Sequence, residues 1–173
     1  MALYLIQNGP MQTTAAPASV ATGTAIKTML QVKLGASTNQ VGKIVEWGIS
    51  FDGSAAAVPG KVELLSTGAV KATITEFVAA DIINLTDANA GAVTDDFPFA
   101  FTAPEDESGY TATAEGTPTT TRTFDLELIA PTNQYVKQFP LGREPTFKNT
   151  EFIRIRVTFA VTVNCYCYMI IEV

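Results

Sequence analysis

The sequence predicts a single all-β domain, a jelly-roll-like antiparallel β-sandwich of about nine or ten strands spanning residues 1–173. Hydrophobic residues make up 47% of the 173-residue chain and charged residues only 16%, which suits a folded protein with a sizeable core. Apolar and polar residues alternate with a period of two in many short segments, as in half-buried strands. The 9 prolines and 12 glycines interrupt most windows long enough to hold a helix.

The first half of the chain is expected to contribute five strands. The clearest covers residues 43–52, where Val45, Trp47 and Ile49 share one face and the residues between them are polar or small. An Asp-Gly-Ser turn signal closes this segment. The other expected strands are residues 3–6, 26–34, 61–66 and 70–78, and residues 78–85 have room for one short helical turn.

The second half carries the strongest alternation. Every odd position from Ile153 to Val173 is apolar, whereas the even positions begin with arginine, threonine and alanine. One strand of this length would be improbably long, so we expect two antiparallel strands with a turn near residues 160–162. The remaining expected strands are residues 109–114, 123–128 and 135–139.

Two cysteines lie close together on the last expected strand. Cys165 and Cys167 are two residues apart, so their side chains point to the same face. Their separation of roughly 6.5–7 Å is at or beyond the limit for an unstrained disulfide. We therefore expect two small, buried, reduced side chains.

Two long segments without strand periodicity are expected to be loops. An N-terminal arm over residues 1–23 contains an almost uncharged Thr/Ala/Pro/Ser stretch from residue 11 onward. A loop over residues 87–108 is acidic and also carries the apolar cluster of residues 97–101. Loops of this length usually serve a function or become ordered against a partner.

The charge distribution argues against two classes of partner. The formal net charge is −6, and the lysines and arginines form no cluster. An acidic chain gains little from counterion release, and it lacks the basic patch that attracts a membrane surface. The N-terminal residues form neither a basic region nor a long apolar run, so we expect no secretion signal and synthesis in the cytosol. We predict no nucleic-acid partner and no membrane partner.

The residues of the commonest catalytic and metal sites are missing. The chain has no histidine, which excludes Ser-His and Cys-His nucleophile pairs and Cys/His zinc sites. Phosphate-binding loops and nucleophile-elbow motifs are also absent from the sequence. We therefore predict that the protein is not an enzyme and binds no cofactor.

Three weak candidates for chemistry remain. Asp125 and Glu127 share one strand face and suggest a glycosidase-type carboxylate pair, but an exposed strand face is the favoured interpretation. Residues 87–91 resemble the start of a calcium loop with Asp95 and Asp96 nearby, although proline stands where the bidentate glutamate belongs. Trp47 could stack on a sugar, but its place on the apolar face of a strand favours a core residue.

Four strings in the chain resemble a family of small virion proteins of tailed bacteriophages, especially those that infect actinobacteria. They are VEWGISFDGSAA (residues 45–56), GYTATAEG (109–116), LIAPTNQYVKQFPLGRE (128–144), and the closing run from RIRV (154–157) to NCYCY (164–168). Together they span most of the chain from residue 24 onward. They are specific as strings and contain no catalytic motif.

The resemblance implies a minor capsid or decoration protein on the outside of the capsid, assembled in the host cytoplasm with the major capsid protein as its partner. A homotrimer is expected by analogy, because decoration proteins commonly sit at symmetry axes. The candidate contacts are Tyr135, Lys137, Phe139 and Arg143 within residues 135–144, and Met11 and Pro17 within the arm. For Arg143, an ordinary surface charge is the favoured interpretation.

Two other function classes remain open at this point. A tail-associated or host-recognition module of lectin-like fold would bind cell-surface sugar through an exposed aromatic and acidic site, with or without calcium. A carboxylate-based hydrolase would require polysaccharide turnover that Asp125→Asn or Glu127→Gln abolishes.

Overall fold

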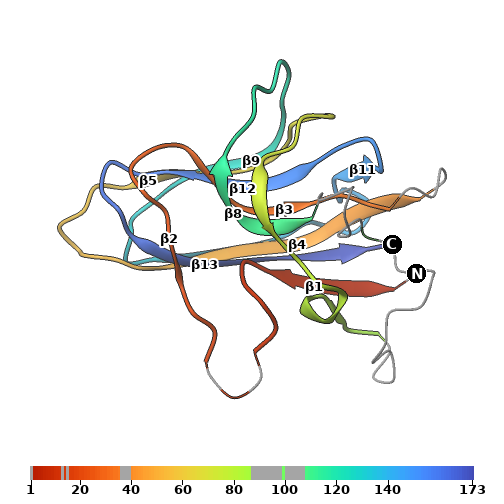
Figure 1. Cartoon of the computed structure of the whole chain (residues 1–173), viewed down its shortest axis with the longest axis horizontal. Helices are drawn as coiled ribbons and strands as arrows, with labels where there is room; N and C mark the ends of the chain where they lie inside the picture. The colour runs from red at the N-terminus through yellow and green to blue at the C-terminus, as the bar shows by residue number, and fades with distance from the viewer. Residues whose placement is uncertain (1, 13, 15, 36–39, 87–98, 100–107) are drawn as a thin grey trace.

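The protein is a two-layer antiparallel β-sandwich, as a computed structural model shows for residues 2–12, 14, 16–35, 40–86, 99 and 108–173 (Figure 1). The first sheet follows the order β10 (Gln134–Gln138), β4 (Val41–Asp52), β13 (Asn164–Glu172), β1 (Leu3–Gln7) and β7 (Ile83–Asn84), with β11 (Thr146–Lys148) on β4 and β2 (Val20–Ala21) on β13. The second sheet follows the order β6 (Thr73–Glu76), β8 (Gly109–Ala114), β3 (Lys27–Val32), β12 (Ile153–Thr158), β5 (Gly60–Ser66) and β9 (Arg122–Ile129).

The connections are those of a crossed sandwich. Among the described strands, none pairs with the strand that precedes or follows it in the chain, and every ladder is antiparallel. The chain therefore passes repeatedly between the two layers, as in jelly-roll-like folds. The predicted fold class is confirmed. The described residues form thirteen strands, more than the predicted nine or ten, because β2, β7 and β11 are short strands of two or three residues that the sequence pattern does not indicate.

The core lies between the two sheets and follows the period-two pattern of the sequence. On β13, Cys165, Cys167, Met169 and Ile171 are all buried, and the residues between them are only half-buried. The predicted turn between β12 and β13 is present, but these strands do not pair with each other. They lie in opposite sheets, and both direct their odd-numbered side chains into the same core.

A bulge in β4 changes one predicted core position. Ile170 pairs with Glu46 while Ile171 pairs with Ile44, so Val45 is an extra residue in this ladder. As a result Ile44 is buried and Val45 is half-buried, contrary to the expectation that Val45 shares the core face of Trp47. A period-two pattern cannot reveal a single inserted residue, because the alternation continues on either side of it.

The two cysteines are free thiols inside the core. Burial raises the pKa of Cys165 to about 12, and burial together with the neighbouring Cys165 raises the pKa of Cys167 as well. We expect neither thiol to react with a water-soluble thiol reagent in the folded protein at neutral pH, and both to react after unfolding in denaturant. Labelling of either cysteine at the rate of a free peptide thiol under native conditions would contradict this burial.

The N-terminal segment is partly built into the sandwich. β1 lies between β13 and β7, with Ile6 in the core, and β2 pairs with β13. Only the connection between β1 and β2 has the loop character expected of an arm, and the Met11 backbone N–H there donates to Asp81 of the 3₁₀ turn η1 (Ala79–Asp81). This turn lies within the short helical segment predicted at residues 78–85.

The predicted acidic loop and calcium site lie mostly outside the described residues. Residues 87–98 and 100–107 are not described, and they include Asp95 and Asp96. Phe99, which is described, is buried and contacts the Tyr4 ring edge-on at 5.2 Å between ring centroids. An apolar side chain of the predicted loop is therefore packed into the core.

Candidate functional site

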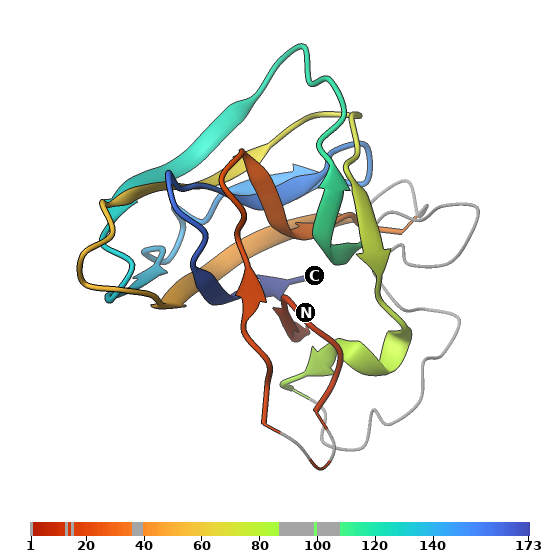
Figure 2. The same cartoon turned by 60° about the vertical axis from the view of Figure 1, so that its left-hand side comes forward.

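A cluster of polar side chains lies at one open side of the sandwich, where the two sheets end. β9 is the last strand of the second sheet and β10 the last of the first, and the turn 130–133 joins them. We call β9, β10 and the following turn at residues 140–143 the β9–β10 flank. Figure 2 shows β9 running along the outer side of the second layer.

Asp125 is the centre of this region. Its carboxylate accepts hydrogen bonds from Trp47 Nε1 at 3.2 Å and Tyr135 Oη at 2.9 Å, both on Oδ2, and forms an ion pair with Lys137 Nζ at 2.8 Å. Tyr135 Oη also lies 3.4 Å from Glu127 Oε1. Because Asp125 belongs to the second sheet and its three donors to the first, the cluster ties the two sheet edges together.

The position of Asp125 corrects the favoured reading of β9. Asp125 is 8% exposed and points inward, so the Asp125–Glu127 face is not a solvent-exposed strand face. The leucines of the same strand point outward instead, with Leu126 47% and Leu128 71% exposed. The usual arrangement, with apolar side chains inside and charged ones outside, is inverted on β9. Tyr135 and Lys137 provide hydrogen-bond and ion-pair partners for the inward carboxylates, which offsets the cost of removing them from water.

The surroundings of Tyr135 keep its hydroxyl protonated. Its pKa is raised above 10.0, first by burial, then by the hydrogen bond to Asp125 and by the negative charges of Asp125 and Glu127. A neutral phenol can donate to a carboxylate, and a phenolate cannot. The Asp125 carboxylate is therefore held by fixed donors from the other sheet, an arrangement that stabilises the contact between the two sheets.

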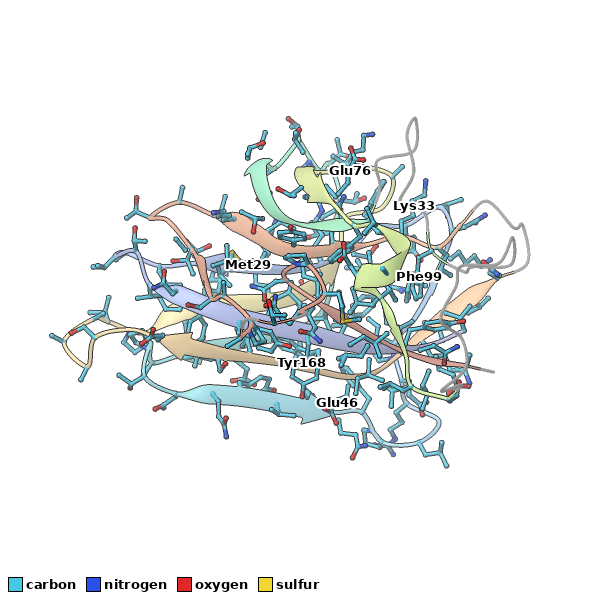
Figure 3. The ribbon with its side chains drawn as sticks, turned by 60° about the horizontal axis from the view of Figure 1, so that its bottom comes forward. Met29, Lys33, Glu46, Glu76, Phe99 and Tyr168 are labelled. Atoms are coloured by element: carbon cyan, nitrogen blue, oxygen red, sulfur yellow. The ribbon has the colours of Figure 1, made fainter. Side chains whose placement is uncertain are left out.

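A second tyrosine on the outer face of the first sheet behaves similarly. Tyr168 packs over Gly48 and donates to Glu46 Oε1 at 2.6 Å, as the neighbouring labelled side chains in Figure 3 show. Burial, followed by the hydrogen bond to Glu46, raises the pKa of Tyr168 to about 12. Tyr166 and Ile170 on the same face are half-buried, so this face of β13 is partly covered within the monomer.

These two tyrosines predict alkaline destabilisation. In the unfolded chain a tyrosine ionises near pH 10, whereas Tyr168 ionises near pH 12 in the folded state and Tyr135 is raised in the same direction. Their stabilising effect is complete below about pH 10 and is lost as the pH rises through about 12. Urea unfolding at increasing pH should show this decline, and Tyr168→Phe should reduce its slope. A flat stability profile across this range would contradict the prediction.

The structure divides the predicted contact residues into two groups. Tyr135, Lys137 and Phe139 lie together on the β9–β10 flank, with Lys137 Nζ 5.5 Å from the centroid of the Phe139 ring. Met11 and Pro17 are exposed in the connection between β1 and β2, where Met11 is bonded to Asp81 of η1. Arg143 is exposed in the turn after β10, where its N–H donates to the carbonyl of Pro140.

Sequence reasoning missed the most exposed apolar side chains of the flank. Val136 and Leu141 are exposed, the latter at 97%, in addition to Leu126 and Leu128 of β9. Tyr135 and Lys137 point inward to Asp125, so the outward positions between and beyond them form the accessible surface. The alternation in residues 134–138 separates two faces of the strand but does not say which face points inward. Tyr135 and Lys137 are polar, so the sequence does not mark their face as the inner one.

Trp47 is fully buried and lies 5.3 Å from the Tyr135 ring between centroids. The prediction of a core tryptophan is confirmed, and its ring has no free face for a sugar. Within the described ranges, no group of three or more Cys, Asp or Glu side chains is placed to hold a metal ion. No helix among these residues is long and apolar enough to cross a membrane.

No family model, curated protein or solved structure matches this chain. The likeness of its sequence strings to phage virion proteins therefore stays a prediction.

A second polar cluster holds two loops against the outer face of the second sheet. Arg154 of β12 is 0% exposed, and its guanidinium donates to the carbonyls of Glu115, at 3.0 Å, and Val70, and to the Glu115 carboxylate, at 3.4 Å. The same carboxylate accepts from the backbone N–H and the hydroxyl of Thr28. Burial lowers the pKa of Arg154 to about 10, partly offset by the charge of Glu115. The guanidinium thus remains charged at neutral pH.

This cluster explains why the strand predicted at residues 70–78 is shorter. The Val70 carbonyl is bonded to Arg154, and the Ala72 backbone N–H donates to the Gln31 side chain. These backbone groups are used before the ladder of β6 begins at Thr73. Next to Glu115, a cavity of about 350 Å³ is lined by residues 22–27 and 112–115 and opens to solvent. Its one described lysine, Lys27, already donates to the Ala21 carbonyl.

Proposed function

We propose that this chain is a bacteriophage capsid decoration protein, a minor capsid protein that binds the outer surface of the shell and stabilises it. Its partner is the major capsid protein, and its oligomeric form is a homotrimer. The proposal rests first on the resemblance of four sequence strings to small virion proteins.

The structural observation that carries the proposal is the surface of the β9–β10 flank. Leu128, Val136 and Leu141 are exposed apolar side chains, and all three belong to the 128–144 string. Leu128 faces outward from the second sheet and Val136 outward from the first, so these side chains border the flank on its two faces. An apolar border of this kind suits a protein partner that wraps the edge of the sandwich. The flank is also internally braced by Asp125, so docking orders little additional backbone.

The mechanism follows from linkage. A protein that binds assembled shell subunits, and not separated ones, stabilises the assembled state in proportion to its occupancy. Such a role needs a rigid body and a complementary surface. The net charge of −6 disfavours competition from packaged nucleic acid.

The copy number in purified particles tests the proposal. Quantitative mass spectrometry against the major capsid protein should find hundreds of copies, in a fixed ratio to the shell subunit. A few copies per particle would place the protein in the tail and favour the host-recognition alternative.

One substitution on the flank should weaken shell binding without unfolding the protein. Leu141 is almost fully exposed, so Leu141→Asp removes no internal packing but places a charge in the proposed contact. We expect about tenfold or greater loss of affinity for shells, with an unchanged melting temperature. Val78→Asp is the matched control, because Val78 is exposed near η1 at the opposite edge of the first sheet. Equal binding by wild-type protein and Leu141→Asp would remove this turn from the contact.

A further inference from the structure

The outer edge of β9 is an unused strand-pairing site. β9 pairs with β5 over Arg122–Ile129, and no described residue pairs with its other side (Figure 2). Every second residue of such an edge presents its backbone N–H and C=O groups away from the sheet. An extended segment of another protein can therefore add to the second sheet by backbone hydrogen bonding.

The two faces of β9 specify different side chains for an added strand. The outer face presents Leu126 and Leu128, both exposed. The inner face presents Asp125 and Glu127. Directly opposite positions in antiparallel strands share a face, so the added strand needs apolar residues opposite the leucines and, alternating with them, residues that suit carboxylates.

Glu127 is the carboxylate with capacity for a new partner. Asp125 is occupied by Trp47, Tyr135 and Lys137, whereas Glu127 accepts only a long hydrogen bond from Tyr135, at 3.4 Å, among the described residues. Glu127 is half-buried, so a lysine or arginine opposite it would form a partly desolvated ion pair.

The same charges disfavour a second copy of this chain as the occupant. Two β9 strands paired in antiparallel fashion, with Leu126 of each copy opposite Leu128 of the other, would place their Glu127 carboxylates directly opposite each other. Like charges directly opposite on adjacent strands are destabilising. The net charge of −6 on each copy acts in the same direction.

We propose that β9 is a docking strand for an extended partner segment in which apolar residues alternate with lysine or arginine. The strand docking stands on β9 alone. The assignment of that segment to the major capsid protein rests on the proposed function.

A synthetic peptide tests the docking directly. The probe is a capped peptide of about eight residues that alternates valine and lysine, added to the isotope-labelled full chain and followed by NMR. Shifts and slowed amide exchange should be confined to β9 and its neighbour β5. A valine–glutamate peptide of the same length should not bind.

Two variants make the test specific. Leu128→Asp should lower the affinity for the valine–lysine peptide by about tenfold or more. The melting temperature of this variant should equal that of the wild-type protein, because the Leu128 side chain is exposed. Glu127→Lys should abolish binding of the valine–lysine peptide and create binding of the valine–glutamate peptide. This exchange of preference is an effect that simple unfolding cannot produce.

Several results would overturn the proposal. These are an absence of β9 shifts at millimolar valine–lysine peptide, equal binding of the two peptides, or a concentration-dependent dimer that Leu128→Asp abolishes. Purified shells of the major capsid protein separate the two proposals. Peptide binding without shell binding would retain the docking strand and reject the decoration function. Equal shell binding by wild-type protein and Leu128→Asp, with no peptide binding, would retain the decoration function and reject the docking strand.

Discussion

Arg154→Ala is expected to lower the free energy of unfolding by about 3–5 kcal/mol. The guanidinium is fully buried, and its bonds to Glu115 and to the Val70 carbonyl hold two loops on the second sheet. The truncation leaves a cavity and removes the charge that faces the Glu115 carboxylate. Urea unfolding followed by circular dichroism measures the loss, which is large relative to the total stability of an ordinary domain.

A matched comparison separates the buried pair from ordinary ion pairs. Lys43 and Glu172 form an ion pair at 3.3 Å with Lys43 38% exposed, so Lys43→Ala should cost less than about 1 kcal/mol. The double variant Arg154→Met/Glu115→Gln removes both charges and should recover part of the loss. If Arg154→Ala costs no more than Lys43→Ala, the cluster does not hold the loops.

Asp125→Ala is expected to cost about 2–4 kcal/mol, because it leaves the buried Trp47 Nε1–H without its acceptor and Tyr135 Oη with only its 3.4 Å contact to Glu127. Trp47 Nε1 and Tyr135 Oη both depend on this carboxylate, and Lys137 loses its counter-charge. Trp47 is the single tryptophan of the chain, so its fluorescence reports on this site alone. We expect a changed emission maximum in the folded state as well as a lower denaturation midpoint.

Glu127→Gln is the control for Asp125→Ala. Among the described residues, Glu127 accepts only the 3.4 Å hydrogen bond from Tyr135, so the change in unfolding free energy should stay within about 0.5 kcal/mol. A double-mutant cycle of Asp125→Ala with Lys137→Met isolates the ion pair from the tryptophan and tyrosine bonds. Equal costs for Asp125→Ala and Glu127→Gln would show that Asp125 does not brace the two sheet edges.

Strands with one clearly apolar face were predictable from the sequence. β5, β8 and β13 were expected close to their observed bounds, and along β13 buried and half-buried positions alternate as the sequence pattern predicts. The very short strands β2 and β7 were not predictable, because two residues contain no period. Their pairing depends on where β13 and β1 run, which is set by the rest of the fold.

The candidate site was predictable only in part. Tyr135 and Lys137 were selected as contacts, and Asp125 was considered as a carboxylate, but nothing in the sequence showed that they meet. The hydrophobic pattern of β9 places its leucines inside, and the structure places them outside. Charged side chains can point inward there because β4 and β10 of the opposite sheet supply hydrogen-bond donors to Asp125. The approach of these strands to β9 is set by the tertiary structure and cannot be seen in the sequence.

The central position of β13 has a consequence for synthesis. This strand follows all the others in the sequence, yet it pairs with β4, β1 and β2 and supplies the core face of the first sheet. A ribosome therefore releases most of the chain before the first sheet can close, and nearly all pairings are distant in sequence. Such topologies fold slowly and only when complete. The β9–β10 flank is then braced only after β13 has been made, so chains that stop before β13 would not present the proposed contact surface.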